Sequence, residues 1–302
     1  MPELPEAETI ARQLQARLAG ARLGEVRWVR ADIVHGARRS LRKMLPGLLI
    51  NRVYRRAKRV VVEVSDASGD PHPVSLVVAL GMTGQLRVCG EDLPVEKHTH
   101  LRVAIADSDQ ELRFRDPRRF GGVWLLPDVN GRLSSRQAGR GRRLRPVGPE
   151  PLDIKPAAFV RLLRRKRSIK SLLLDQTIIA GLGNIYCDES LFAAAIHPRR
   201  AADSLSEAEA KALLRAIKSI LRRAIRFNGS TFMDYRSANG ASGSFQRFHK
   251  VYNRGGEACR ACRAVIEKTT IAGRTSCYCG TCQPMRGTAE SPALARRGKR
   301  VK

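Results

Sequence analysis

Two Cys-x2-Cys pairs near the C-terminal end constrain the fold of this chain more than any other feature of its sequence. Cys259 and Cys262 form the first pair, Cys279 and Cys282 form the second, and sixteen residues separate them. This spacing is typical of a zinc ribbon, in which each pair supplies two thiolates to one tetrahedral ion. Because four thiolates complete the coordination shell, we expect one structural Zn2+ with no open position for catalysis.

A further cysteine of this region, Cys277, could compete with Cys279 as a ligand. A single residue separates the two, and this spacing directs successive sulfur atoms poorly toward one ion, so Cys279 is the expected ligand. The alternative is that the clustered cysteines are merely buried thiols. Metal ligation is favoured over disulfides, because disulfides are rare in a reducing cell.

The charge of the chain indicates an anionic polymer as its partner. Its 302 residues include 56 Lys and Arg against 28 Asp and Glu, a formal net charge of +28. The basic residues are spread through every region, which is typical of proteins that bind nucleic acid. An acidic membrane surface is the rival, but the sequence has no signal peptide and no apolar run of about 18 residues. We therefore expect a cytoplasmic protein that associates with nucleic acid and not with a membrane.

The hydrophobic pattern changes along the chain from helix to strand and back to helix. Apolar residues at helical spacing precede Gly20, and Ser206 with Glu209 forms a capping-box pattern before a second amphipathic stretch. Residues 180–198 indicate a glycine turn that opens a helix, with Pro198 at its end. Between the first two helical regions lie short β-rich runs, which predict a sandwich or barrel. These runs are residues 60–64, 73–80, 101–105, 111–114 and 123–126.

Six motifs, in this order, resemble those of bacterial formamidopyrimidine-DNA glycosylase in the Fpg/Nei family. The resemblance spans residues 2 to 283, nearly the whole chain. The motifs are the opening PELPEAET, RRAK (55–58), LGMTG (80–84), DPRRFGG (116–122), LGNIY (182–186) and GRTSCYCGTCQ (273–283).

The resemblance implies an α+β fold with an N-terminal β-sandwich, a helical helix-two-turn-helix domain and a C-terminal β-hairpin zinc finger. It also implies a monomer that binds double-stranded DNA containing oxidised bases or abasic sites. The expected division is a catalytic domain over 1–128, a basic linker over 129–150, the helix-two-turn-helix domain over 151–235, the lesion loop and zinc finger over 236–283, and a basic disordered tail over 284–302.

The activity implied by the family is excision of oxidised purines, such as 8-oxoguanine and formamidopyrimidines, followed by β,δ-elimination at the abasic site. An amine nucleophile suits this chemistry, because attack at the sugar C1′ yields a Schiff base whose iminium acidifies the C2′ proton. An α-amino group titrates near 8, below the value of about 10.4 for lysine. By resemblance the nucleophile is Pro2, made available by removal of Met1.

Three further residues have implied catalytic roles. Glu3 gives and takes back protons, as a carboxyl group beside the nucleophile can do. Lys58 assists elimination and steadies the sugar or phosphate of the lesion. Arg274 of the zinc finger binds phosphate and assists the second elimination, whereas Glu6 is expected to serve the helix dipole and local orientation.

The remaining site residues are implied DNA contacts. Met82, Arg118 and Phe120 would fill the hole left by a flipped base, with Arg118 facing the orphaned cytosine. Asn184 would hold backbone phosphate together with Arg274. Further expected contacts are His98, Arg165 and Lys170. His98 and His100, two apart on a probable strand, could also suggest a metal pair.

Two alternative functions compete with this one. An endonuclease VIII-like glycosylase for oxidised pyrimidines shares the nucleophile, the helical motif and the zinc finger, although its opening is usually PEGPE. A noncatalytic zinc-finger DNA-binding protein would need only the charge and the ribbon. The chain also departs from the common family pattern, with Ala79 where a histidine often precedes LGM, and GSF (243–245) where GYF is common.

Overall fold

The structure, a computed structural model of the chain, describes residues 2–35, 38–66, 74–129, 132–133, 144–231 and 237–285. Three predicted segments therefore lie wholly or partly outside the described residues. They are most of the basic linker, the start of the lesion loop with the residues just before it (232–236), and the tail from residue 286. No helix in the described ranges is long and apolar enough to cross a membrane.

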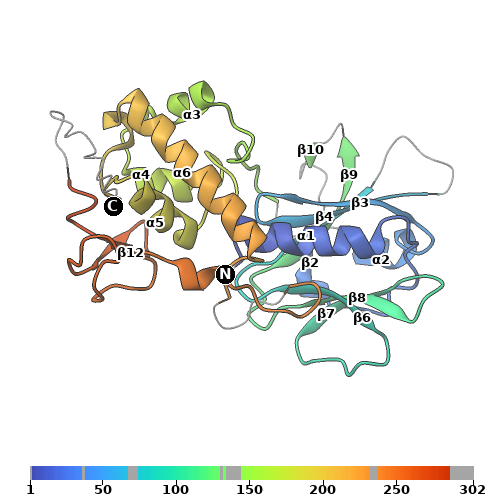
Figure 1. Cartoon of the computed structure of the whole chain (residues 1–302). Helices are drawn as coiled ribbons and strands as arrows, with labels where there is room; N and C mark the ends of the chain where they lie inside the picture. The colour runs from blue at the N-terminus through green and yellow to red at the C-terminus, as the bar shows by residue number, and fades with distance from the viewer. Residues whose placement is uncertain are drawn as a thin grey trace, which may run out of the picture.

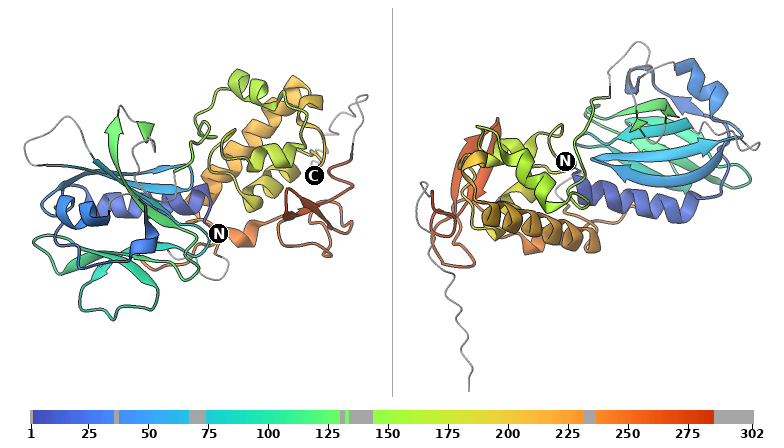
Figure 2. Two further views of the ribbon diagram at one scale, coloured as in Figure 1. Left: turned by 180° about the vertical axis from the view of Figure 1, so that it is seen from behind. Right: turned by 90° about the horizontal axis from the view of Figure 1, so that it is seen from above.

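The chain folds into a β-rich lobe and a helical lobe that carries the β-hairpin (Figure 1; Figure 2). The β-rich lobe contains two sheets, which confirms the predicted sandwich. One sheet has the order β10-β9-β5-β4-β3, with β2 parallel to β9, and the other has the order β1-β7-β8-β6. The strands of the first sheet are β2 (Val34–His35), β3 (Leu49–Arg56), β4 (Arg59–Ser65), β5 (Val74–Ala79), β9 (Gly122–Val129) and β10 (Arg132–Leu133). Those of the second are β1 (Trp28–Val29), β6 (Gln85–Gly90), β7 (Thr99–Ala104) and β8 (Gln110–Arg115).

Helix α1 (Leu4–Leu18) packs against β3 and β4 of the first sheet and β6 of the second. Its apolar residues Ile10, Leu14 and Leu18 are buried in the core of the sandwich, as their spacing predicts. The lobe also contains η1 (Ala31–Ile33) and α2 (Arg38–Met44). Because α1 begins at the helical lobe and runs along the sandwich, its N-terminus lies where the two lobes meet (Figure 1).

The helical lobe has its own hydrophobic core around α5 and α6. The predicted capping box begins α6: the Ser206 hydroxyl accepts from the Glu209 N–H, and the Glu209 carboxylate accepts from the Ser206 N–H. Helix α5 ends before the predicted Pro198, because Ala195 adopts a left-handed φ of 55° and Ile196 N–H donates to Leu191 C=O. The helices are α3 (Pro156–Leu163), α4 (Ile169–Leu174), α5 (Asn184–Ala193), η3 (Ala202–Ser204), α6 (Glu207–Arg226) and η4 (Phe245–Phe248). The hairpin consists of β11 (Glu267–Ile271) and β12 (Arg274–Tyr278).

Candidate active site at the junction of the lobes

The N-terminus of α1 is anchored on the N-terminus of α5. The Glu3 carboxylate accepts hydrogen bonds from the backbone N–H groups of Ile185, at 3.0 Å, and Tyr186, at 3.4 Å. The first N–H groups of a helix have no partner within the helix, so a carboxylate there is stabilised by both the hydrogen bonds and the helix dipole. Pro2 and Glu3 are both buried. Two of the four residues with predicted catalytic roles thus lie buried where the two lobes meet.

The glycines of the LGN motif allow this close approach. A Cβ atom on Gly183 would lie 2.3 Å from the carboxyl carbon of Glu3, and one on Gly181 would lie 2.7 Å from a methyl group of Leu4. Gly181 also has a φ of 81°, and its carbonyl oxygen accepts from the Leu4 N–H. A larger residue at Gly183 would therefore push Glu3 out of its position.

Glu6 lies directly beneath Glu3 in a fully buried polar network. Its carboxylate accepts from the Glu3 N–H at 2.8 Å, the Tyr186 hydroxyl at 2.6 Å and the Ser230 N–H at 2.7 Å. Burial raises the pKa of Glu6 above its usual value, and the nearby charge of Glu3 adds to this effect. Ser230 in turn contacts the buried His249 at 3.1 Å. These hydrogen bonds of Glu6 hold the start of α1 against Ser230 and Tyr186, which is consistent with the local orienting role expected for Glu6.

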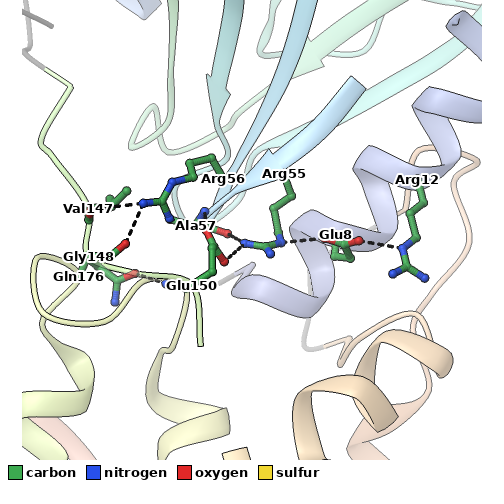
Figure 3. A network of polar contacts seen from close by, with 10 residues as sticks. Glu8, Arg12, Arg55, Arg56, Ala57, Val147, Gly148, Glu150 and Gln176 are labelled. Atoms are coloured by element: carbon green, nitrogen blue, oxygen red, sulfur yellow. Dashed lines mark hydrogen bonds and ion pairs between the residues drawn. The ribbon is translucent and has the colours of Figure 1, made fainter. Parts of the chain in front are cut away.

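Lys58 lies with Ala57 in the tight turn between β3 and β4. Glu150 holds this turn from the helical lobe: its carboxylate accepts from Arg55 at 2.5 Å, from Arg56 at 2.6 Å and from the Ala57 N–H at 2.7 Å (Figure 3). Ala57 has a left-handed φ of 56°. Sequence reasoning missed Glu150. The signal that could have found it is its position between two prolines in GPEP, which restrict the backbone on both sides of the carboxylate.

The environment of Lys58 links it to the other predicted catalytic groups. Burial lowers the pKa of the Lys58 ammonium; the negative charge of Glu3 opposes this effect and the positive charge of Arg274 adds to it. Lys58 therefore lies within electrostatic range of both Glu3 and Arg274. A lowered pKa also leaves more of the lysine as free amine, so Lys58 is a second amine that could attack a sugar.

Arg274 begins the outgoing strand of the zinc hairpin and is exposed. Asn184, at the start of α5, donates from its side-chain amide to the Thr275 carbonyl at 2.8 Å. The Lys170 ammonium contacts the same carbonyl at 3.3 Å and pairs with Asp188 at 2.6 Å. Asn184 thus contacts the residue next to Arg274, and joint binding of phosphate by the two stays a prediction.

The predicted DNA contact at Lys170 does not fit this arrangement. Its side chain is fully buried, and its ammonium is engaged by Asp188 and the Thr275 carbonyl. Asp188 also accepts from the Ser276 hydroxyl and the Cys277 N–H. Lys170 and Asp188 therefore hold the zinc hairpin on α4 and α5, and the charge of Lys170 faces Asp188 instead of a phosphate.

Two loops carry the predicted void-filling residues, and buried Asp116 joins them. Its carboxylate accepts from the Thr83 hydroxyl at 2.5 Å and from the Gly121 N–H at 2.7 Å. The Arg118 guanidinium lies over the Phe120 ring at 4.6 Å, and 48 % of Phe120 is exposed. Met82, on the other loop, is half-buried. The structure thus brings the two loops together, and the side chains of Arg118 and Phe120 are both exposed to solvent.

The two histidines of the second sheet do not lie on one strand face. His98 precedes β7, is exposed and has a left-handed φ of 70°. His100 lies on β7, is buried, and its Nε2 atom contacts the Asp116 carbonyl at 2.9 Å. The expectation of a shared strand is therefore wrong, and the pair does not form a metal site. Arg165 is exposed in the turn between α3 and α4.

The described part of the lesion loop is anchored on the β-rich lobe near its start, at Ala238 and Asn239. Arg17 of α1 donates to the Asn239 side chain at 3.4 Å, to the Val88 carbonyl at 3.0 Å and to Gln110 at 3.1 Å. Ala238 is buried in the sandwich core. The start of the loop that the family resemblance places over the flipped base is therefore fastened to the β-rich lobe.

The four predicted zinc ligands converge on one point. Their sulfur atoms all lie within 4.8 Å of one another, with Cys259 and Cys282 at 3.9 Å and Cys262 and Cys279 at 3.4 Å. Sulfur atoms around a tetrahedral Zn2+ with bonds of about 2.3 Å lie about 3.8 Å apart. The residues thus fit one structural zinc ion. Cys277 is not part of the group, and its N–H is bonded to Asp188 instead.

Comparison with known proteins agrees with this geometry. The chain matches the family models described as formamidopyrimidine-DNA glycosylase N-terminal domain (residues 1–123), its H2TH domain (147–236) and the zinc finger found in FPG and IleRS (256–284). It is 40 % identical over 291 residues to the formamidopyrimidine-DNA glycosylase of Desulforamulus reducens, covering 94 % of this chain and 99 % of that protein. The chain belongs to the formamidopyrimidine-DNA glycosylase family. A second relative, from Herpetosiphon aurantiacus, is 41 % identical over 289 residues, or 94 % of this chain and all of that one.

Solved structures of the family have the same fold. The wild-type Lactococcus lactis Fpg (MutM) in complex with N7-benzyl-Fapy-dG containing DNA matches with a TM-score of 0.81 and 35 % identity, over 94 % of this chain and all of that one. MutM in complex with carbocyclic 8-oxo-G containing DNA matches with a TM-score of 0.80 and 34 % identity, over the same shares. The family and the α+β fold are confirmed, whereas the division at 128, 150, 235 and 283 and the roles of individual site residues stay predictions.

Proposed function

We propose that this chain is a bifunctional DNA glycosylase and abasic-site lyase of base excision repair that excises oxidised purines from double-stranded DNA. The observation that carries this proposal is the buried start of the chain. Pro2 and Glu3 lie together at the junction of the lobes, with Glu3 held on the N-terminus of α5. Family members have been solved with DNA that contains Fapy-dG, 8-oxo-G and an abasic site.

The Pro2 nitrogen, freed of Met1, is the nucleophile in this proposal. It attacks C1′ of the damaged nucleotide, the bond from C1′ to the base breaks, and the base leaves with the bonding pair and takes up the proton that the attacking nitrogen loses. The C1′–O4′ bond then breaks as the nitrogen lone pair forms the iminium, and O4′ takes a proton from Glu3. The iminium acidifies C2′, so that loss of its proton expels the 3′ phosphate, and a second elimination expels the 5′ phosphate. Lys58 assists the eliminations and Arg274 the second of them.

The DNA contacts follow the same division of roles. Met82, Arg118 and Phe120 occupy the space vacated by the extruded nucleotide, and Arg118 reads the opposite cytosine. Asn184 and Arg274 hold the phosphates beside the lesion. His98 and Arg165 contact the backbone farther away. We propose that the active form is a monomer, because every group named belongs to one chain. We also propose that the enzyme acts in the cytoplasm.

Borohydride trapping on DNA with 8-oxoguanine tests the proposal. Borohydride reduces the iminium to a stable amine, so the wild-type protein should form a covalent adduct. The Pro2→Gly variant should form little adduct, and protein that retains Met1 should form none. Equal trapping by all three proteins would contradict the proposal, and no trapping by any would favour the noncatalytic zinc-finger alternative.

The lesion class is tested by comparing excision of 8-oxoguanine with excision of thymine glycol. The proposal predicts faster release of 8-oxoguanine. One solved structure pairs the Lactococcus lactis enzyme with an oxidised pyrimidine, so rates on both lesions are needed and one positive result is insufficient. Preference for thymine glycol would favour the endonuclease VIII-like alternative.

A further inference from the structure

Helix α6 carries three arginines on the side opposite its buried face. An α-helix turns by about 100° per residue, so Arg215, Arg222 and Arg226 fall on one stripe, roughly opposite the centre of the buried residues. All three are exposed. The buried residues of α6 are Ala210, Leu213, Leu214, Ile217, Leu221, Ala224 and Ile225.

The stripe has no internal counter-charge. Within the described part of the chain, the guanidinium groups of Arg215, Arg222 and Arg226 have no ion-pair or hydrogen-bond partner. The two acidic residues of α6 lie in its first turn, where Glu207 pairs with Lys211 and Glu209 with Arg200. No Asp or Glu occurs between residues 210 and 233. Because paired charges would be partly neutralised within the fold, this stripe presents its full charge to a partner.

Two more arginines and two aromatic rings extend the stripe. The Arg223 guanidinium lies over the Phe248 ring at 4.2 Å, and Arg247 of η4 lies 5.3 Å from the Phe227 ring and 5.0 Å from the Phe248 ring. Stacking on a ring holds a guanidinium in a fixed orientation while its N–H groups stay available. We call the set of Arg215, Arg222, Arg223, Arg226 and Arg247 the α6 surface.

The α6 surface lies apart from the candidate active site. The buried face of α6 packs on α1, on α3 and on α5, whose N-terminus holds Glu3 and carries Asn184. The exposed stripe is on the opposite side of α6 and therefore points away from these elements. Seen from above, α6 runs along one side of the helical lobe, and the N-terminus of the chain lies toward the other side (Figure 2, right). A duplex held by Asn184 and Arg274 is thus separated from the α6 surface by the body of the lobe.

We propose that the α6 surface binds a second segment of double-stranded DNA while the first occupies the active site. From Arg215 to Arg226 the stripe is about 16 Å long at 1.5 Å per residue. Duplex DNA carries one charge per about 1.7 Å of its axis, so several phosphates can face the stripe. Arginine forks bind phosphate oxygens in pairs, whatever the base sequence. The enzyme then holds two segments at once and can pass between them while it searches for lesions.

The test measures capture of a second duplex by the full-length protein. Wild-type protein is first saturated with a tethered duplex that contains an abasic-site analogue, and a labelled, undamaged duplex is then added at rising salt. The triple variant R215Q/R222Q/R226Q should capture less of the second duplex, with its log–log salt slope lowered by about 2.7 for three lost phosphate contacts. The charge-conserving triple R215K/R222K/R226K should still capture it.

A matched triple controls for loss of net charge. R42Q/K43Q/R161Q removes three positive charges from exposed basic residues outside the α6 surface and outside the zinc finger, and it should capture the second duplex as wild type does. The proposal is wrong if this control loses as much capture of the second duplex as the α6 triple does. It is also wrong if the α6 triple captures the second duplex as well as wild type does. Excision on one short lesion duplex, measured in parallel, should be equal in all variants, so failure of the catalytic proposal is seen separately.

Discussion

At the residue scale, the Glu3 carboxylate combines an anchoring contact with a proposed proton transfer. Glutamine at this position keeps an oxygen that can accept from the Ile185 and Tyr186 N–H groups, but it has no acid proton. We expect Glu3→Gln to slow base excision by at least about 100-fold, the scale of general acid–base catalysis, with the melting temperature nearly unchanged. Single-turnover excision and thermal unfolding measure the two effects. A variant that excises at the wild-type rate would remove Glu3 from the mechanism.

His249 gives the fold a dependence on acid. Burial lowers the pKa of His249 to about 4, below its usual 6.5, and the positive charge of Arg260 adds to the effect. Between about pH 6.5 and 4 the unfolded chain therefore binds a proton that the folded chain does not, so stability falls as the pH falls, by at most about 1.4 kcal/mol per unit.

The variant His249→Gln can keep the contact with Ser230 and does not titrate. As the pH falls from 6.5 to 4, the free energy of unfolding of this variant should decrease less than that of wild type. Urea unfolding at several pH values measures the difference. Parallel curves for the two proteins would show that His249 does not carry this dependence.

At the scale of elements, the zinc hairpin connects a structural metal to a proposed catalytic group. Arg274 begins the strand that leads to Cys279, so loss of the ion should disorder the hairpin and weaken binding of lesion DNA. We expect Cys262→Ser to lose both zinc and DNA binding. Cys89→Ser, which alters a cysteine of β6 far along the chain, is the control and should keep both. Metal analysis and a binding titration check this, and tight lesion binding by zinc-free protein would refute it.

Elements with a strong local signal could be predicted from the sequence, and others could not. The Ser206 capping box and the apolar spacing of α1 and α6 give helices where expected, because caps and periodicity act within one element. Strands β3 and β6 were missed because both mix charged and apolar residues, and pairing with neighbouring strands decides their conformation. The early end of α5 depends on Ala195, a residue with no preference for a left-handed φ.

At the scale of the whole molecule, contacts between the lobes hold the site together. Glu150 in the helical lobe fastens the turn that contains Lys58 in the β-rich lobe (Figure 3). Only 13 % of its side chain is exposed. We expect Glu150→Gln to lower the free energy of unfolding by about 1.5–3 kcal/mol, because three donors lose a charged acceptor. Elimination at an abasic site should slow as Lys58 shifts.

The control for this change is Glu63→Gln. Glu63 pairs with Arg52, whose side chain is 59 % exposed, and such pairs contribute less than about 1 kcal/mol. Chemical denaturation of both variants gives the comparison. Equal losses of stability would mean that Glu150 contributes no more than a surface ion pair.

Contacts between lobes are also what sequence reasoning could not supply. The zinc ligands were predictable because their spacing alone specifies the chemistry. The catalytic roles of Pro2, Glu3 and Lys58 come from the family motifs and stay predictions. Glu150 pairs with arginines more than 90 positions earlier, and Lys170 pairs with Asp188 of a different helix. Such partners depend on how the elements pack. Lys170, which was expected to contact DNA, is therefore found buried and paired with Asp188.

The identity of the amine that bonds to the sugar tests the central claim most directly. The proposal assigns the bond to the Pro2 nitrogen, and the rival amine is the Lys58 side chain, whose pKa is lowered by burial. Wild-type protein trapped with borohydride on 8-oxoguanine DNA can be digested, and mass spectrometry of the peptides then locates the added deoxyribose fragment. We predict the fragment on Pro2 of chains that have lost Met1. A fragment on Lys58, with Pro2 unmodified, would contradict the account.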